Sequence, residues 1–327
     1  MRSVQAIITD IVLSKGKGFD NSTDRDYEAE RKKNARMTGF KLSKGMSLEE
    51  IDLNGQKAEL IKKEGNDKGL IFYIHGGGFT TGSARERRIF TYPAVRKYGY
   101  DCMSINYRLA PENKWPAQIE DCLEAYENTL KIGYDPKDII LMGESAGGTL
   151  VLSLGLFLKD RGLPMPKVIV AFSPATDQYE DLPSHKANIK TDRMLRDGVA
   201  KGICDVLFDH KPSEAELKQY LLSPYYGDYE GLPPIHLSAS DSEVLYDDAR
   251  ILYEKLKKEG HEVMYEEGYR VCHAYQIMTY MPESRKTLKN MFRYIEEIKG
   301  EDNGKIRKGS SFQETLQSKQ KRAAVKK

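Results

Sequence analysis

Cysteine is scarce in this sequence, and no motif pairs the few that are present. The four cysteines lie at positions 102, 122, 204 and 272 and form no Cys-x-x-Cys pair. This spacing indicates neither a disulfide framework nor a thiolate zinc site. Free thiols suit a reducing compartment, so we expect a cytoplasmic protein without a metal site.

Long apolar runs and an excess of one charge are also missing. No stretch approaches the roughly 18 apolar residues of a membrane-spanning helix, and the apolar stretch before Asp10 is too short for the core of a signal peptide. The 51 Lys and Arg residues nearly balance 49 Asp and Glu residues, for a net charge of +2. We therefore expect no nucleic-acid partner and no stable membrane insertion.

The charge is uneven only toward the end of the chain. Residues 301–327 hold eight Lys and Arg residues against three Asp and Glu residues, a net charge of +5, which leaves −3 for the first 300 residues. The same segment is polar and poor in aromatic residues. We expect it to be a basic, disordered tail.

Apolar runs typical of buried strands alternate with helical patterns through most of the chain. Residues 46–53 and 56–61, joined by Asn54-Gly55, predict a hairpin at an antiparallel sheet edge. The expected strands that follow cover 69–75, 99–106, 138–143, 167–173, 234–240 and 262–267, and the expected helices cover 117–132, 146–161, 246–259 and 283–299. Such alternation is typical of a mostly parallel sheet with helices on both faces, so the fold class is α/β.

A candidate nucleophile lies where an expected strand turns into an expected helix. Residues 143–147 read Gly-Glu-Ser-Ala-Gly. A tight strand-to-helix turn built of small residues exposes a serine hydroxyl at the top of a parallel sheet. The pattern alone also occurs in ordinary turns of small residues. Ser145 is therefore a candidate whose role depends on other motifs.

A glycine-rich loop upstream supplies such a motif. The expected strand 69–75 runs into His-Gly-Gly-Gly-Phe at residues 75–79. Successive glycines after a strand leave backbone N–H groups that can stabilise the oxyanion of an acyl-transfer reaction. A phosphate-binding loop is the competing interpretation, but neither nucleotide-binding glycine pattern accompanies these residues.

Together these motifs resemble the hormone-sensitive-lipase-like family of α/β-hydrolase carboxylesterases. The resemblance spans about residues 69–275, and its blocks occur in the order that the family shows. The blocks are His-Gly-Gly-Gly at 75–78, Tyr-Arg-Leu-Ala-Pro-Glu at 107–112, Trp-Pro-Ala at 115–117, Gly-Glu-Ser-Ala-Gly-Gly at 143–148, Ser-Pro-Ala-Thr-Asp at 173–177, Ser-Pro at 223–224 and Gly-Leu-Pro-Pro at 231–234. It implies an α/β-hydrolase fold and a serine esterase that needs no metal or organic cofactor.

The resemblance also assigns roles to the remaining members of the site. Among the six histidines, the family places its base in the loop after the last strand, at His273, and uses His75 structurally. The family pattern favours Glu243 as the acid that orients this base. The commoner residue at this place is Asp, so Glu243 is a departure from the family pattern. Asp241 is the alternative acid.

The oxyanion hole and the substrate pocket complete the expected site. The backbone N–H groups of the glycine loop and of the residue after the nucleophile would hold the oxyanion. These residues are Gly76, Gly77, Gly78 and Ala146. We also expect Phe79 to line the substrate pocket.

Two stretches interrupt the alternation of strands and helices. They are residues 1–45, with a charged helical pattern at 23–33, and residues 178–222. In the resembled family these positions form a helical cap over the site, although ordinary surface helices would give the same pattern. The expected catalytic core then comprises residues 46–177 and 223–300, followed by the tail at 301–327.

The expected substrate is a small ester with a short to medium acyl chain, cleaved by a single chain or a homodimer. An amidase or deacetylase on the same fold is chemically close, since the two differ in how the leaving group is protonated. A non-catalytic binding protein is a third reading. It is disfavoured because position 273 is histidine.

Overall fold

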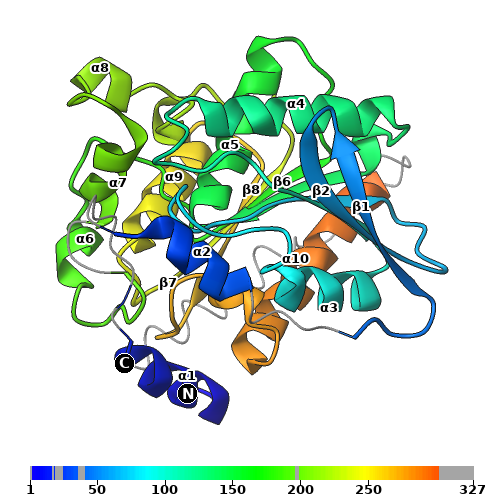
Figure 1. Ribbon diagram of the computed structural model, residues 1–327, viewed down its shortest axis with the longest axis horizontal. Helices are drawn as coiled ribbons and strands as arrows, with labels where there is room; N and C mark the ends of the chain where they lie inside the picture. Colours follow the sequence, from blue (N-terminus) through cyan, green and yellow to red (C-terminus); the bar gives the residue numbers. More distant parts are fainter. Residues whose placement is uncertain (1, 17, 19–24, 36–40, 196–198, 302–327) are drawn as a thin grey trace.

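An eight-stranded sheet forms the centre of the protein (Figure 1). The computed structural model describes residues 2–16, 18, 25–35, 41–195 and 199–301. The strands are β1 (Met46–Leu53), β2 (Gln56–Lys63), β3 (Leu70–Ile74), β4 (Asp101–Ile105), β5 (Ile139–Glu144), β6 (Val168–Phe172), β7 (Ile235–Ser240) and β8 (Val263–Gly268). Their order is β1-β2-β4-β3-β5-β6-β7-β8. Strand β2 pairs antiparallel with β1 on one side and with β4 on the other. The remaining neighbouring strands, in the order β4-β3-β5-β6-β7-β8, pair parallel.

The predicted hairpin at the sheet edge is confirmed. Leu53 pairs with Gln56 across the turn, and Asn54 and Gly55 both have positive φ angles, of 61° and 91°. Two successive residues in that region are what a tight two-residue hairpin turn requires, which is why Asn-Gly is favoured there. Strand β2 is two residues longer than expected and continues to Lys63.

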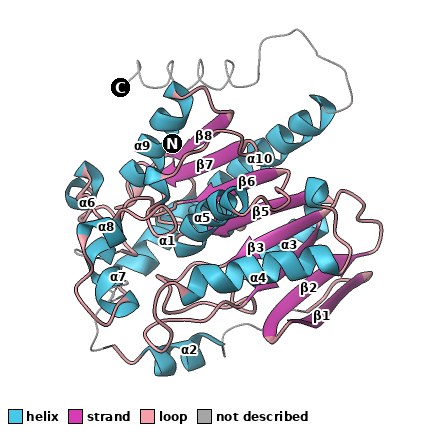
Figure 2. Ribbon diagram, turned by 90° about the horizontal axis from the view of Figure 1, so that it is seen from above, coloured by secondary structure: helices cyan, strands magenta, loops and turns pink. Residues whose placement is uncertain are grey.

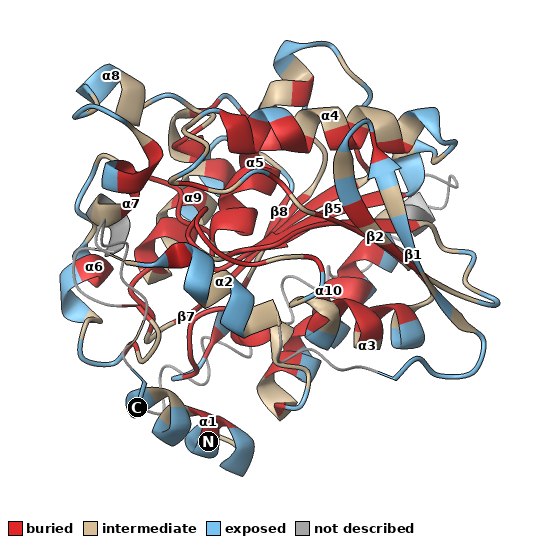
Figure 3. Cartoon of the chain, in the orientation of Figure 1, coloured by how far each residue is buried: buried red, intermediate tan, exposed pale blue. Residues whose placement is uncertain are grey.

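Helices cover both faces of the sheet (Figure 2). One face is covered by α4 (Ala117–Lys131), α5 (Ala146–Asp160) and α9 (Tyr246–Lys258), and the other by α3 (Arg88–Tyr98) and α10 (Pro282–Glu301). Strands β3 to β8 are buried almost throughout, whereas β1 at the edge of the sheet is mostly exposed or half-buried (Figure 3). The predicted fold class is therefore confirmed.

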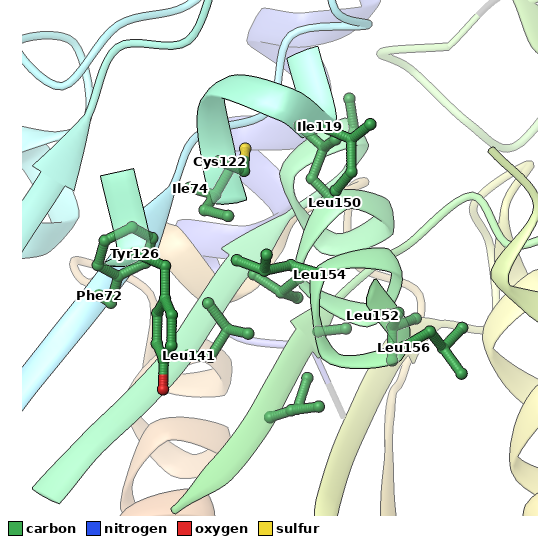
Figure 4. Packing of buried hydrophobic residues seen from close by; sticks show 14 of the residues in the cluster. Phe72, Ile74, Ile119, Cys122, Tyr126, Leu141, Leu150, Leu152, Leu154 and Leu156 are labelled. Atoms are coloured by element: carbon green, nitrogen blue, oxygen red, sulfur yellow. The ribbon is translucent and has the colours of Figure 1, made fainter. Parts of the chain in front are cut away.

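The core on the α4 and α5 side consists of large apolar side chains in direct contact (Figure 4). Each such residue stabilises the fold by about 1.5–3 kcal/mol when it leaves water. The strands contribute Phe72, Ile74 and Leu141, and the helices contribute Ile119, Cys122, Tyr126, Leu150, Leu152, Leu154 and Leu156. This packing holds β5 and α5 rigidly on either side of residue 145.

Two helices were not expected from the sequence. Helix α3 contains Pro93, and an internal proline normally argues against a helix because it removes a backbone hydrogen bond. Helix α1 (Val4–Ser14) buries only Ala6 and Thr9 and leaves most of its aliphatic residues exposed. The pattern of apolar residues in α1 therefore does not predict which side of the helix is buried.

The two stretches outside the alternation contain short helices. Helix α2 (Tyr27–Ala35) overlaps the charged helical pattern expected at 23–33, and α6 (Pro183–Ala187), α7 (Val199–Leu207) and α8 (Glu214–Leu217) lie between β6 and β7. The division into core and cap stays a prediction. Apart from Glu301, which ends α10, the expected tail lies outside the described residues.

Candidate active site

Ser145 lies on the tight turn between β5 and α5. Its φ of 55° and ψ of −126° are a conformation that a residue with a side chain adopts only under constraint. Its N–H donates to the carbonyl oxygen of Phe172 at 2.8 Å, which holds the turn in place. A Cβ atom on Gly147 would lie 2.1 Å from the carbonyl oxygen of Ile74. Only glycine therefore allows α5 to lie this close to β3.

Three predicted residues from distant parts of the chain meet in one line. Nε2 of His273 lies 2.9 Å from Oγ of Ser145, and Nδ1 of His273 lies 2.8 Å from Oε2 of Glu243. An ionised carboxylate only accepts, so Nδ1 carries the proton and Nε2 is left to accept from the serine hydroxyl. This arrangement can draw a proton away from Ser145.

Burial and charge shift the pKa values of His273 and Glu243. His273 is 3% exposed, and Glu243 has no exposed surface. Burial by itself lowers the pKa of His273, but the hydrogen bond and the negative charge of Glu243 outweigh it and raise that pKa above its usual value. Burial raises the pKa of Glu243, and the hydrogen bond to His273 opposes that rise. The carboxylate of Glu243 therefore favours the protonated form of His273.

Asp241, the alternative acid, does not contact His273. Its Oδ1 accepts from the N–H of Arg270 at 2.6 Å and from the hydroxyl of Ser242 at 2.7 Å. The side chain of Glu243 instead folds back so that its Oε1 accepts from the N–H of Ser240 at 3.1 Å. Of the two candidates, only Glu243 lies beside the imidazole.

The glycine loop brings backbone donors to the neighbourhood of Ser145. Among the described residues, no acceptor is recorded for the N–H groups of Gly77, Gly78 or Ala146. Gly77 and Gly78 have φ angles of 119° and 58°, and a Cβ atom on Gly77 would lie 2.2 Å from the carbonyl oxygen of Thr81. Free N–H groups of this kind can bind a developing negative charge.

Gly76 requires a correction. We expected its N–H among the oxyanion donors, but it donates to Oε1 of Glu144 at 2.7 Å. The buried Glu144 also accepts from the hydroxyl of Tyr73 and from Nε of Arg87. Glu144 is thus occupied in holding the glycine loop against the serine turn. Gly76 supports the loop and has no N–H left for an oxyanion.

Phe79 requires a second correction. It has no exposed surface and packs against Trp115 with ring centroids 6.3 Å apart. Its positive φ of 59° belongs to the tight turn after the glycines. Phe79 is therefore a core residue, and it lines no accessible pocket in this structure.

His75 begins the glycine loop and is buried without exposure. Its ring stacks on Tyr107 at 4.4 Å, and its Nδ1 lies 2.8 Å from the carbonyl oxygen of Gly76. Burial, with the positive charge of Arg87, lowers its pKa to about 3. A histidine that stays neutral in this way supports the structural role implied by the resemblance.

A network of hydrogen bonds that was not predicted fixes the loop that carries Glu243. Asp192 is 3% exposed, and its Oδ2 accepts from the N–H of Val244 at 2.9 Å. Nδ2 of Asn188 donates to the carbonyl oxygen of Glu243 at 2.9 Å, and the hydroxyl of Ser184 donates to that of Val244 at 2.6 Å. The stretch between β6 and β7 thus holds the backbone of Glu243 and of Val244 beside it. No motif in the sequence marks these residues.

A second missed contact joins helix α2 to the glycine loop. Nε of Arg31 donates to the carbonyl oxygen of Thr80 at 2.6 Å, and its Nη2 donates to that of Ala110 at 2.6 Å. The same guanidinium also donates to Glu112, from Nη2 to Oε2 at 2.9 Å and from Nη1 to Oε1 at 3.1 Å. One arginine therefore ties the residues before the sheet to two loops of the core.

Within the described ranges, no group of three or more His, Cys, Asp and Glu side chains is placed to hold a metal ion. No helix in the same residues is both long and apolar enough to cross a membrane.

Comparison with known proteins places these residues in a wider context. Residues 71–277, which include Ser145, Glu243 and His273, match a family model described as alpha/beta hydrolase fold. An acetyl-hydrolase of Streptomyces hygroscopicus is 29% identical over 247 residues, covering 75% of this chain and 81% of that protein. An esterase of Acinetobacter venetianus is 29% identical over 252 residues, covering 76% and 82%.

Solved structures extend the similarity to the fold. The crystal structure of EstE5 soaked with p-nitrophenyl butyrate has a TM-score of 0.81 at 28% identity and covers 90% of this chain and 99% of that one. An esterase from the bacterial hormone-sensitive lipase family has a TM-score of 0.80 at 29% identity and covers 91% and 99%. The similarity therefore includes nearly the whole of both neighbours.

Proposed function

Because this chain belongs to the α/β-hydrolase family and its structural neighbours are esterases of the hormone-sensitive lipase group, we propose that it cleaves carboxylic esters through an acyl-enzyme on Ser145. It is a carboxylesterase, as the names of its relatives indicate. The observation that carries the proposed mechanism is the pair of hydrogen bonds, of 2.9 and 2.8 Å, that links Ser145 to His273 and His273 to Glu243.

The mechanism follows from the chemistry of these groups. Oγ of Ser145 attacks the ester carbonyl carbon while Nε2 of His273 takes the hydroxyl proton. Glu243 stabilises the resulting imidazolium. His273 then protonates the leaving alkoxide, the alcohol departs, and the acyl group remains on the serine.

Hydrolysis of the acyl-enzyme repeats these steps with water. His273 takes a proton from the attacking water, and its return to Oγ releases the acid and restores Ser145. We assign the oxyanion in both halves to the N–H groups of Gly77, Gly78 and Ala146. Each such donor contributes about 2.7–4 kcal/mol to catalysis in enzymes of this kind.

We further propose that residues 1–45 and 178–222 form a cap that limits the acyl chain to short or medium length. Two contacts support this. Arg31 donates to the carbonyl oxygen of Thr80, just after the glycines, and Asp192 accepts from the N–H of Val244, next to Glu243. A cap would exclude water and give the acyl group an apolar wall. Deleting residues 1–45 should therefore weaken discrimination among acyl lengths, whereas deleting residues 302–327 should not.

The cellular setting is part of the proposal. The four cysteines are buried and unpaired, as expected in a reducing cytoplasm. Cytoplasmic location and assembly as a homodimer both stay predictions. Fractionation of cells and light scattering of the purified protein would test them.

Covalent labelling tests the proposed nucleophile. The protein would be treated with a fluorophosphonate, and the modified residue mapped by mass spectrometry. We expect the label on Ser145 and its loss in Ser145→Ala. Ser153→Ala, which removes a hydroxyl from the adjoining helix α5, is the matched control and should keep the label. Labelling that persists in Ser145→Ala would overturn the assignment.

A substrate series tests the bond that is cleaved. p-Nitrophenyl esters of increasing chain length would be compared with the corresponding p-nitroanilides. We expect the highest kcat/KM on short or medium esters. Faster cleavage of the anilides would identify an amidase instead.

A further inference from the structure

Helix α1 presents an apolar face to solvent. Five aliphatic residues keep between 44% and 68% of their surface exposed in the described structure. They are Val4, Ile7, Ile8, Ile11 and Val12, and we call them the α1 face. They recur at helical spacing and so lie on one side of the helix, which Figure 3 shows at the edge of the protein. Exposed aliphatic residues gathered in this way mark an interaction site.

The opposite side of α1 is fixed to the body of the protein. Ala6 and the partly buried Leu13 pack against Val271 and Cys272, in the cluster that also contains Tyr275. Val271, Cys272 and Tyr275 all lie within two residues of His273 in the chain. Two polar contacts secure the helix: Ser3 donates to Glu283 through its N–H at 2.6 Å and through its hydroxyl at 2.7 Å, and the hydroxyls of Thr9 and Tyr280 lie 2.9 Å apart. The α1 face is therefore held at a set place beside the loop of the proposed base.

The charges around the helix are mostly positive. Asp10 is the one acidic residue of α1, and it lies 3.4 Å from both Arg2 and Arg193. Lys15 follows the helix and is exposed, as is Arg285, which donates to the carbonyl oxygen of Tyr280 at 2.8 Å. Counting these four basic residues against Asp10 and Glu283 gives a net charge of +2. Such a setting complements a negatively charged surface.

The size of the face argues against a second copy of the chain as its occupant. A helix of 11 residues is about 16 Å long and about 10 Å wide, so one side offers only a few hundred Å². A stable protein interface needs about 800 Å² from each partner. A short helix with an apolar side and basic neighbours is instead typical of segments that lie in a membrane interface.

We propose that α1 lies in the surface of an anionic lipid bilayer, with the α1 face among the acyl chains and the basic residues at the headgroups. The consequence for catalysis rests on the proposed function: the site would then meet ester substrates dissolved in the lipid. Binding itself does not depend on that function, since it involves no residue assigned to the reaction.

Vesicle sedimentation tests the proposal with the full chain. The protein would be mixed with vesicles of phosphatidylcholine alone and of phosphatidylcholine with phosphatidylglycerol. We expect sedimentation with the anionic vesicles, weakening as salt is raised because the charges are screened. Ile8→Glu should lower the partition coefficient on the order of tenfold or more, because it removes one buried aliphatic group and adds a negative charge.

Gln5→Glu is the matched control, because it adds the same charge to α1 without removing an aliphatic side chain. It should lower binding much less than Ile8→Glu. Circular dichroism would show that both variants keep their helix content. A failure of the proposed function would be seen separately, as absent hydrolysis of dissolved p-nitrophenyl acetate by the unchanged protein.

Two outcomes would overturn the proposal. One is sedimentation that is absent with both vesicles or unchanged in Ile8→Glu. The other is a dimer in light scattering that Ile8→Glu dissociates, which would assign the α1 face to a second copy of the chain.

Discussion

Nε of Arg31 donates to the carbonyl oxygen of Thr80 at 2.6 Å, and this bond joins a helix ahead of the sheet to the turn that carries the glycine donors. The N–H groups of Thr80 and Thr81 both donate to the carbonyl oxygen of Gly77, at 3.1 and 3.0 Å. Arg31 therefore holds one end of a closed turn whose other end is Gly77. We assign it the role of a positioning residue for the oxyanion donors.

Replacing Arg31 should consequently impair catalysis more than substrate binding. Arg31→Ala should lower kcat about tenfold, because a displaced oxyanion donor costs transition-state stabilisation, with a much smaller change in KM. Steady-state kinetics on a short p-nitrophenyl ester would measure both constants. Arg31→Lys should recover little of the lost kcat, because lysine cannot reproduce the forked contacts of the guanidinium.

Lys32→Ala is the control for the Arg31 prediction. It removes another ion pair from helix α2, that of Lys32 and Glu28 at 2.5 Å, whose side chains are 68% and 69% exposed. It should leave kcat nearly unchanged. An equal fall in kcat for both variants would mean that the segment as a whole, and not Arg31, supports the turn.

The two candidate acids should differ sharply in their effect on catalysis. Glu243→Gln should lower kcat by up to about 10⁴, as loss of the triad carboxylate does in related chemistry. Asp241→Asn should cost far less, because Asp241 contacts Arg270 and Ser242 and not the imidazole. Comparison of kcat for the two variants measures this directly, and the reverse ranking would transfer the role to Asp241.

The pH dependence of kcat/KM should report the pKa of His273. The reaction needs neutral His273, so kcat/KM should fall as the pH drops through that pKa. Burial lowers this pKa, but Glu243 raises it more, to above the usual 6.5. Glu243→Gln removes the raising influence, so its residual activity should persist to lower pH than that of the unchanged protein. An acid limb that does not move would show that Glu243 leaves the pKa of the base unaffected.

Asp192 should matter for both stability and catalysis. Its carboxylate accepts from the N–H groups of Met194, Leu195 and Val244, at 2.8, 3.0 and 2.9 Å. Asp192→Ala leaves these donors without that acceptor, and a buried unsatisfied donor costs about 1–3 kcal/mol. We expect the free energy of unfolding in urea to fall by about 2–4 kcal/mol, accompanied by a lower kcat.

Asp209→Ala is the matched control in the same stretch. Asp209 pairs with Lys114 at 3.2 Å, and the aspartate side chain is 79% exposed. Exposed pairs contribute about 0–1 kcal/mol, so this variant should be close to the unchanged protein. Equal destabilisation by the two substitutions would contradict the anchoring role of Asp192.

The serine turn and the hairpin could be predicted because their requirements are local. Asn54 and Gly55 adopt positive φ angles that few other residues tolerate. Gly143 and Gly147 permit contacts with neighbouring backbone that no side chain would allow. Such requirements leave a signature in adjacent residues, so they could be read before any fold was known. His273 was found similarly, from its place after the last strand and the resemblance to known esterases.

Contacts between distant segments could be settled only in three dimensions. Glu243 and Asp241 are two residues apart, and the turn after β7 directs one toward His273 and the other toward Arg270. The N–H of Gly76 donates to Glu144, and the side chain of Phe79 lies in the core. Arg31 and Asp192 act on loops about 50 residues away in the chain. A charged residue in a polar segment is normally solvated, so nothing in its neighbours reveals the partner that folding brings to it.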